Sequence, residues 1–187
     1  MNKYKVLLKI VKLINKVYVR TKYEGLENIP KSGPFILAGN HTHLFDPGPI
    51  MSITDRQIHF LSKSSLFKMP QALIFKNMGL IKVNRDGNDK EAYESAVKYL
   101  KDGEIVGIYP EGTREHGRGL LPFKNGAVRM SNETNSVIIP FAYVGKYRPF
   151  GIGKRLIIRF GKPYKAKKDV DKSTKELREI IRGLLEQ

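Results

Sequence analysis

The sequence contains no cysteine among its 187 residues. A chain without cysteine forms no disulfide bonds, offers no thiolate ligands to zinc or iron–sulfur clusters, and has no cysteine nucleophile. Long apolar runs are also missing, since no stretch reaches the roughly 18 consecutive apolar residues that a membrane-spanning helix needs. We therefore expect a chain that does not cross a bilayer by itself and that uses other side chains for any catalysis.

Acidic residues are scarce relative to basic ones. The chain has 34 lysine and arginine residues against 18 aspartate and glutamate residues, which gives a formal net charge of +16 at pH 7. This excess predicts a polyanionic partner, which can be nucleic acid, an anionic membrane surface or a phosphorylated substrate. Hydrophobic residues make up 41% of the chain, and glycine and proline are dispersed, so the composition excludes disorder and favours one compact domain.

The first twenty residues predict a basic amphipathic helix. Helical spacing places four lysines on one narrow stripe, namely Lys5, Lys9, Lys12 and Lys16. The opposite face is wide and apolar, and it carries Tyr4, Leu7, Leu8, Val11, Ile14 and Tyr18. A lysine interrupts every apolar run within four residues, so the segment lacks the core of a secretory signal and we expect it to be retained. The periodicity leaves two interpretations open: the helix binds a membrane interface, or it packs on the core with its lysines in solvent.

Residues 21–187 alternate between short apolar runs and amphipathic stretches. The apolar runs predict strands at 35–38, 58–61, 80–83, 105–109, 137–144 and 156–160. Helical spacing covers 64–77, 88–101, 124–133 and 173–186, and the last of these begins with a capping box of Ser173 and Glu176. The alternation predicts a single α/β domain over 21–187, with a mixed, mostly parallel sheet flanked by helices and preceded by the N-terminal amphipathic helix at 1–20. Binding sites in such sheets collect where loops leave the carboxyl ends of the strands.

The loop after the first predicted strand contains His41, His43 and Asp46. Asp46 followed by Pro47 is typical of a helix start with a carboxylate N-cap. The two histidines and the carboxylate also suggest a metal site, but no further histidine or cysteine cluster completes a ligand set, so we expect no metal. A third interpretation pairs His41 as a base with Asp46 as the carboxylate that orients it, which requires the loop to fold back.

Two other predicted strands end in charged residues. The strand at 105–109 runs into a turn that contains Glu111 and Arg114, which can form an exposed ion pair or contact a substrate. The strand at 80–83 leads to Arg85.

Taken together, these segments resemble the glycerolipid acyltransferase family, and within it the bacterial 1-acylglycerol-3-phosphate acyltransferases that make phosphatidic acid. The resemblance covers roughly residues 20–165 and includes family-like positions at 25–30, 60–63 and 123–126. Four blocks carry it, in the family's order and approximate spacing: Asn40-His41-x4-Asp46, Gly79-x-Ile81-x-Val83-x-Arg85, Tyr109-Pro110-Glu111-Gly112-Thr113-Arg114, and Val137-Ile138-Ile139-Pro140. The departures are small, such as Tyr109 where phenylalanine is usual.

The resemblance implies a mechanism and a set of site residues. His41 would take the proton from the sn-2 hydroxyl of lysophosphatidic acid as that oxygen attacks an acyl thioester, and Asp46 would orient His41. The chain has no cysteine and no Gly-x-Ser-x-Gly motif, so direct transfer is expected rather than an acyl-enzyme. The resemblance also implies substrate-binding roles for Lys63, Arg85, Glu111, Gly112, Thr113 and Arg114, with the lysine and the two arginines around the acceptor phosphate.

The implied partners are lysophosphatidic acid, an acyl-CoA or acyl carrier protein donor, and an anionic membrane surface. No cofactor beyond the acyl donor is expected. The long acyl chains of the substrates favour membrane docking by the N-terminal helix, with the protein peripheral on the cytoplasmic face of the cell membrane. A nucleic-acid or phosphate-binding module would explain the +16 charge but not the His–Asp loop, so we expect no nucleic acid. Glycerol-3-phosphate or another lysophospholipid is the alternative acceptor.

Overall fold

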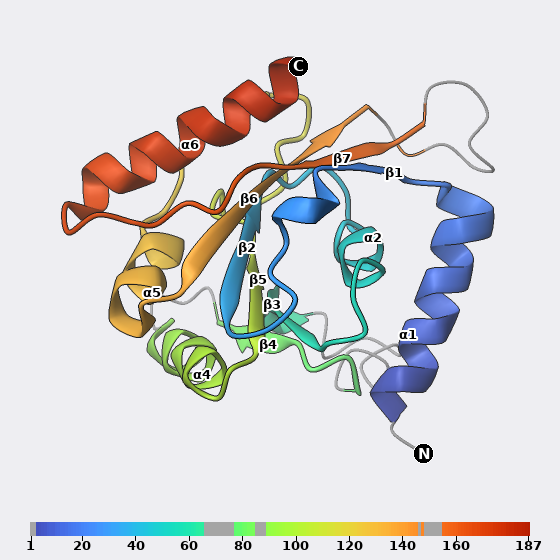
Figure 1. The fold of residues 1–187 in the computed structure, drawn as a ribbon, viewed down its shortest axis with the longest axis horizontal. Helices are drawn as coiled ribbons and strands as arrows, with labels where there is room; N and C mark the ends of the chain where they lie inside the picture. Colours follow the sequence, from blue (N-terminus) through green and yellow to red (C-terminus); the bar gives the residue numbers. More distant parts are fainter. Residues whose placement is uncertain (1–2, 66–76, 85–88, 146, 148–154) are drawn as a thin grey trace.

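The computed structural model describes residues 3–65, 77–84, 89–145, 147 and 155–187 (Figure 1). A seven-stranded sheet runs through this part of the chain in the order β1-β7-β6-β2-β5-β3-β4. Its strands are β1 Lys22–Glu24, β2 Phe35–Gly39, β3 Ile58–Lys63, β4 Ile81–Val83, β5 Ile105–Ile108, β6 Val137–Val144 and β7 Ile157–Phe160. Every pairing in this sheet is parallel except that of β6 with β7. The predicted α/β fold with a mixed, mostly parallel sheet is confirmed.

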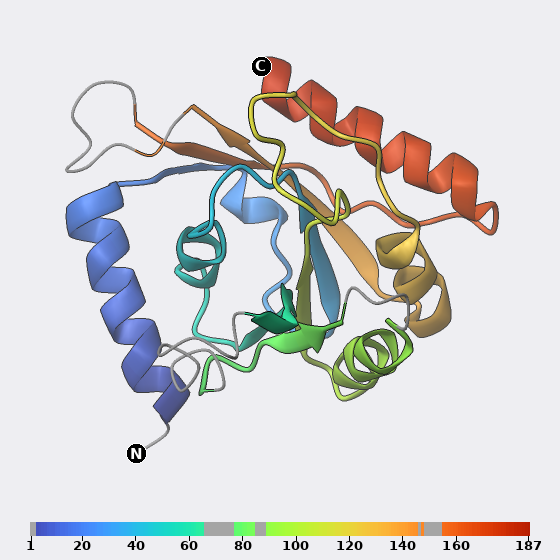
Figure 2. The same cartoon turned by 180° about the vertical axis from the view of Figure 1, so that it is seen from behind.

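Helices cover both faces of the sheet (Figures 1 and 2). One face carries α1 Lys3–Ile14 and α2 Pro47–Met51, and the other carries α4 Lys90–Lys101, α5 Gly126–Thr134 and α6 Val170–Glu186. A π-helical turn, η1 Asn15–Val19, extends α1, and a 3₁₀ turn, η2 Leu26–Asn28, follows β1.

The central strand β2 is buried along its whole length and contributes side chains to both cores. Phe35 and Leu37 pack in the core beneath α1 and α2, whereas Ile36 and Ala38 pack in the core beneath α4, α5 and α6. This alternation follows from the twofold side-chain period of a strand. Because both faces of β2 are covered, the strand reads as a continuous apolar run in the sequence.

Most of the predicted elements are present, and the differences have simple causes. All six predicted strands exist, but β1 was not predicted because it is a polar edge strand of three residues. The predicted helix at 64–77 falls almost entirely on residues 66–76, which lie outside the described residues. The predicted capping box is wrong, because α6 begins at Val170 and the Asp169 side chain accepts the amide N–H of Lys172 (2.9 Å). The hydroxyl of Ser173 instead accepts the amide N–H of Lys167 (2.9 Å), outside the helix.

The N-terminal helix packs on the core, as one of the two interpretations of the sequence proposed, and it also has exposed apolar side chains. One stripe of α1 packs on the core through the buried residues Tyr4 and Leu8, and α1 contacts α2. Another apolar stripe is exposed to solvent and consists of Ile10, Leu13, Ile14, Val17 and Tyr18. The apolar surface of this segment is therefore wider than its packing on the core requires.

A short polar chain fixes the end of this helix to the rest of the protein. Asn15 is buried, and its side-chain oxygen accepts a hydrogen bond from the hydroxyl of Thr21 (2.6 Å). Its side-chain nitrogen donates a hydrogen bond to the hydroxyl of Tyr23. The hydroxyl of Tyr23 donates to the carbonyl oxygen of Pro49 in α2 (2.7 Å). The N-terminal segment and α2 are thus joined by hydrogen bonds as well as by apolar packing.

No helix within the described ranges is both long enough and apolar enough to span a membrane.

Candidate active site

The predicted site residues that the structure describes gather at one edge of the sheet. His41 follows β2, the segment 109–114 follows β5, and Lys63 is the last residue of β3. These strands are neighbours in the order β2-β5-β3 and run parallel, so their carboxyl ends lie together. The sequence predicted a binding site at this kind of edge, where loops leave the carboxyl ends of parallel strands.

The loop after β2 folds back so that Asp46 meets His41. The Nδ1 atom of His41 lies 2.8 Å from Oδ2 of Asp46. The same carboxylate oxygen accepts the amide N–H groups of Thr42 (2.7 Å) and His43 (2.9 Å). Asp46 is completely buried, whereas the His41 side chain is 20% exposed. This is the geometry of a base and the carboxylate that orients it, because Nδ1 is engaged and Nε2 remains for a proton.

The structure gives less support to the other two interpretations of this loop, which are a helix N-cap at Asp46 and a metal site. Asp46 stands immediately before α2, but its side chain caps no amide of that helix and turns back to the loop instead. The ring of His43 packs against the rings of Phe45 and Tyr147. Within the described part of the chain, no group of three histidine or acidic residues is arranged to hold a metal ion.

An aromatic ring stacks on the imidazole of His41. This ring belongs to Tyr109, and the two ring centroids lie 4.2 Å apart with the planes 13° apart. Tyr109 directly follows β5 and is fully packed, and its burial raises the pKa of its hydroxyl well above 10. The stack therefore holds a neutral ring against the imidazole at neutral pH.

Glu111 holds the backbone of His41 in place. Its carboxylate accepts the amide N–H of His41 (2.8 Å) and that of Leu121 (2.9 Å), and the residue is 6% exposed. Burial raises the pKa of this carboxyl, although the two amide hydrogen bonds act in the opposite direction. The carbonyl oxygen of His41 in turn accepts the amide N–H of Glu115 (2.9 Å). The amide N–H and the carbonyl oxygen of His41 are therefore both hydrogen-bonded to residues of the loop after β5.

The contacts of Glu111 differ from those considered at the sequence level. The structure gives no ion pair between Glu111 and Arg114, both of which it describes. Glu111 faces backbone amides instead, so within this structure it supports the histidine loop rather than lining the cavity.

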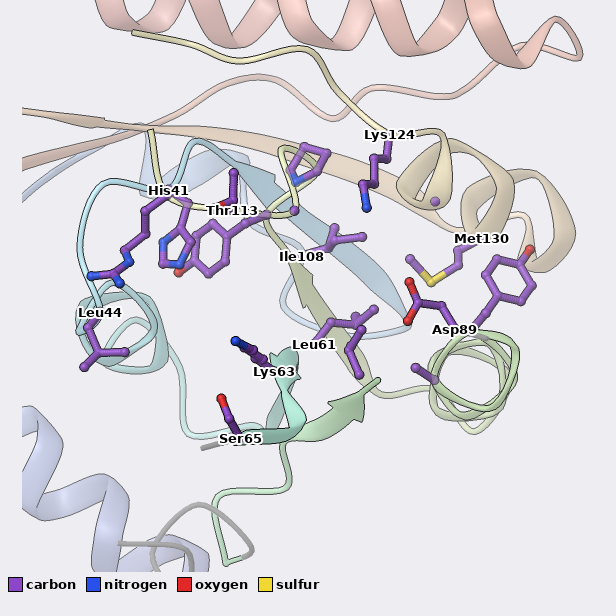
Figure 3. Close-up of a pocket in the computed structure, with 18 of the residues that line it drawn as sticks. His41, Leu44, Leu61, Lys63, Ser65, Asp89, Ile108, Thr113, Lys124 and Met130 are labelled. Carbon is purple, nitrogen blue, oxygen red and sulfur yellow. The ribbon is translucent and has the colours of Figure 1, made fainter. Parts of the chain in front are cut away.

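A cavity of about 600 Å³ opens beside His41 (Figure 3). Five of the predicted site residues line it: His41, Lys63, Gly112, Thr113 and Arg114. Asp46 and Glu111 lie behind its wall, and Arg85 lies outside the described residues. Apolar side chains between the sheet, α4 and α5 form another part of the wall, namely Leu61, Val83, Ala92, Ile108 and Met130. The cavity thus combines cationic side chains near the histidine with an apolar region.

Lys124 also lines this cavity, although it was not among the site residues predicted from the sequence. Its amide N–H donates to the carbonyl oxygen of Pro110 (2.8 Å), which brings it to the turn after β5. Gly112 has a φ of +70°, and a Cβ at this position would lie 3.1 Å from Cε of Lys124. The backbone conformation therefore favours glycine here, and a Cβ would also require the flexible end of the lysine side chain to shift slightly. The signal available in the sequence was the family-like stretch at 123–126.

The carboxyl end of β6 supports the loop from the other side. The side chain of Asn40 accepts the amide N–H of Tyr143 (2.8 Å), and the hydroxyl of Tyr143 donates to the main-chain oxygen of Asp46. Tyr143 is buried, and burial raises its pKa well above 10, so this hydroxyl keeps its proton. Gly39 ends β2 against the same layer, since a Cβ there would lie 2.2 Å from the ring of Phe141.

Comparison with known proteins agrees with this geometry. The profile of the acyltransferase family matches residues 20–144, which include every segment of the site. The chain belongs to this acyltransferase family. The 1-acyl-sn-glycerol-3-phosphate acyltransferase of Bacillus subtilis is 31% identical over 144 residues, which cover 76% of this chain and 71% of the relative.

Two further comparisons place this acyltransferase among its relatives. The 1-acyl-sn-glycerol-3-phosphate acyltransferase of Borreliella burgdorferi is 35% identical over 119 residues, which cover 62% of this chain and 48% of the relative. The chain thus spans about half the length of that protein. The crystal structure of the 1-acyl-sn-glycerophosphate acyltransferase from Thermotoga maritima matches with a TM-score of 0.77 at 24% identity, over 96% of this chain and 78% of the other. That match shows a shared fold.

Proposed function

We propose that this acyltransferase moves a fatty acyl group from an acyl thioester to the sn-2 hydroxyl of lysophosphatidic acid, which gives phosphatidic acid. The observation that carries the proposal is the 2.8 Å contact between His41 and Asp46, in which His41 lines a cavity that also presents Lys63 and Arg114. The names of the relatives from Bacillus subtilis and Borreliella burgdorferi support the choice of acceptor. The donor is acyl-CoA or an acyl carrier protein, and the chemistry requires no further cofactor.

The reaction proceeds by direct transfer. Nε2 of His41 takes the proton of the sn-2 hydroxyl while the hydroxyl oxygen attacks the thioester carbonyl, so that a C–O bond forms and a tetrahedral intermediate results. The C–S bond then breaks, and the imidazolium returns the proton to the departing thiolate. Asp46 keeps the proton of His41 on Nδ1 and stabilises the imidazolium between these two steps.

The acceptor phosphate binds to the cations of the cavity. Lys63 and Arg114 come from the carboxyl ends of neighbouring strands and line the same cavity as His41. A guanidinium can bind a phosphate dianion through two parallel hydrogen bonds, which a lysine cannot reproduce. Arg85, which lies outside the described residues, is proposed as the third cation, and the turn at Gly112 and Thr113 as the contact to the acceptor glycerol.

The protein binds peripherally to the cytoplasmic face of the cell membrane, where its lipid substrates are found. Large apolar side chains are exposed on the N-terminal segment, including Leu13 (62% exposed) and Val17 (53%). Phe45, in the loop between His41 and α2, is 67% exposed. Soluble surfaces rarely present such residues together, and the lysines of α1 add attraction to anionic lipid headgroups.

The first prediction concerns the two histidines of the loop. His41→Ala should lower the rate of phosphatidic acid formation by roughly a thousandfold or more, because it removes the base. The matched control is His43→Ala, since His43 lies in the same loop but outside the cavity wall, and we expect it to keep most of the activity. The assay uses purified protein in mixed micelles, both donors, and a panel of lysophosphatidic acid, glycerol-3-phosphate and other lysophospholipids. Equal loss in both variants, or preference for another acceptor, contradicts the proposal.

The second prediction concerns the acceptor phosphate. Arg114→Ala should raise the KM for lysophosphatidic acid about 10- to 100-fold, because a charge-assisted hydrogen bond contributes ~1.5 to 3 kcal/mol. The KM for the acyl donor should stay close to that of the unmodified protein. Arg118→Ala is the control, since Arg118 is exposed and does not line the cavity. A rise in the donor KM alone would assign Arg114 to the donor phosphates and reverse the placement of the two substrates.

The third prediction concerns membrane binding. Leu13→Glu combined with Val17→Glu should abolish sedimentation with vesicles of phosphatidylglycerol and phosphatidylcholine, because it places two anions on the exposed apolar stripe. Both side chains are exposed, so the melting temperature should not change. Ser95→Glu is a control on α4, across the sheet from α1, and it should bind vesicles normally. Undiminished sedimentation of the double variant would rule out this surface as the membrane contact.

A further inference from the structure

The two oxygens of the Asp46 carboxylate have different environments. Oδ2 accepts three hydrogen bonds from within its own loop, from His41, Thr42 and His43. Oδ1 faces away from His41 and accepts the hydroxyl of Tyr147 at 2.9 Å. The hydroxyl of Thr42 also approaches Oδ1, but at a longer distance of 3.4 Å. Tyr147 is therefore the main partner of this buried oxygen.

We propose that Tyr147 is a positioning residue for the His41–Asp46 pair, through the hydrogen bond of its hydroxyl to Oδ1 of Asp46. The proposal rests on the function proposed above, in which His41 is the base. Tyr147 does not line the cavity and does not contact the reacting atoms in this assignment.

The carboxylate of Asp46 can rotate about its Cβ–Cγ bond. Oδ2 points at Nδ1 of His41 only over a narrow range of this rotation, and the donors on Oδ2 all come from one loop. A donor on the opposite oxygen restricts the rotation from outside that loop. Asp46 is completely buried, so solvent does not reach its carboxylate in the intact protein and the tyrosine hydroxyl is the main donor to Oδ1.

Two further observations fit this role. The ring of Tyr147 packs on the ring of His43, with centroids 4.6 Å apart, and His43 itself donates its amide N–H to Asp46. Burial raises the pKa of Tyr147 far above 10, and the charge of Asp46 acts in the same direction. The hydroxyl therefore stays protonated and remains a donor throughout the pH range in which an enzyme of this kind works.

Kinetics of Tyr147→Phe test the hydroxyl separately from the ring. We expect kcat to fall roughly 10- to 100-fold with both KM values unchanged, because a small misplacement of a catalytic group has an effect of this size. Tyr147→Leu, which also removes the ring, should show the same kcat as Tyr147→Phe together with a lower melting temperature. An unchanged kcat in Tyr147→Phe, or a raised KM in place of a lowered kcat, overturns the proposal.

A double-variant comparison separates positioning from a general structural effect. When Asp46→Asn has already impaired the orientation of His41, adding Tyr147→Phe should not reduce kcat further. Multiplicative losses would show that Tyr147 acts independently of Asp46 and would contradict the proposal.

A measurement without turnover keeps this test apart from that of the proposed function. In the intact protein the proton on Nδ1 of His41 should give a sharp NMR resonance, assigned by its absence in His41→Ala. Tyr147→Phe should broaden or shift that resonance, whereas an identical resonance overturns the positioning role. If the intact protein forms no phosphatidic acid but the resonance still responds to Tyr147→Phe, the proposed function fails and the positioning role stands.

Discussion

The buried carboxylate of Asp46 is the group on which the arrangement of the site depends. A charged oxygen removed from water is tolerated only when donors surround it, since an unpaired buried charge costs several kcal/mol. Asp46 meets this requirement with two backbone amides, the ring nitrogen of His41 and the hydroxyl of Tyr147. The loop therefore cannot relax without leaving this charge unpaired, and the orientation of His41 follows from the way the charge is satisfied.

The rest of the molecule supports this loop from three directions. The loop after β5 holds the peptide of His41 through Glu111, and Tyr109 stacks on its ring. The end of β6 contributes Tyr143, which binds the main-chain oxygen of Asp46. The third support is α2, which follows Asp46 directly. Hydrogen bonds through Tyr23 join α2 to the end of the N-terminal helix. The exposed apolar surface and the histidine loop thus belong to one packed unit.

Much of this could be predicted from the sequence, because buried parallel strands and a charged loop at a strand end have clear local patterns. His41 and Asp46 are five residues apart, so their contact could be considered from spacing alone. Tyr147 is 101 residues from Asp46. Its contact with Asp46 depends on the position of β6 beside β2 in the sheet, and no local sequence pattern specifies that position. Glu111 was expected to contact substrate because it stands in a charged turn at the end of a buried strand. Only the packing of the loop after β5 reveals that its carboxylate accepts two backbone amides.

Equilibrium unfolding of Asp46→Ala in urea, compared with His41→Ala, tests most directly whether this carboxylate holds the site together. Asp46→Ala leaves two backbone amides and a tyrosine hydroxyl without their acceptor, so the account predicts that it lowers the free energy of unfolding by ~3 kcal/mol or more. His41→Ala leaves three of the donors to Asp46 in place and should lower it by about 1 kcal/mol at most. Equal stability of the two variants would contradict the central role of the Asp46 carboxylate.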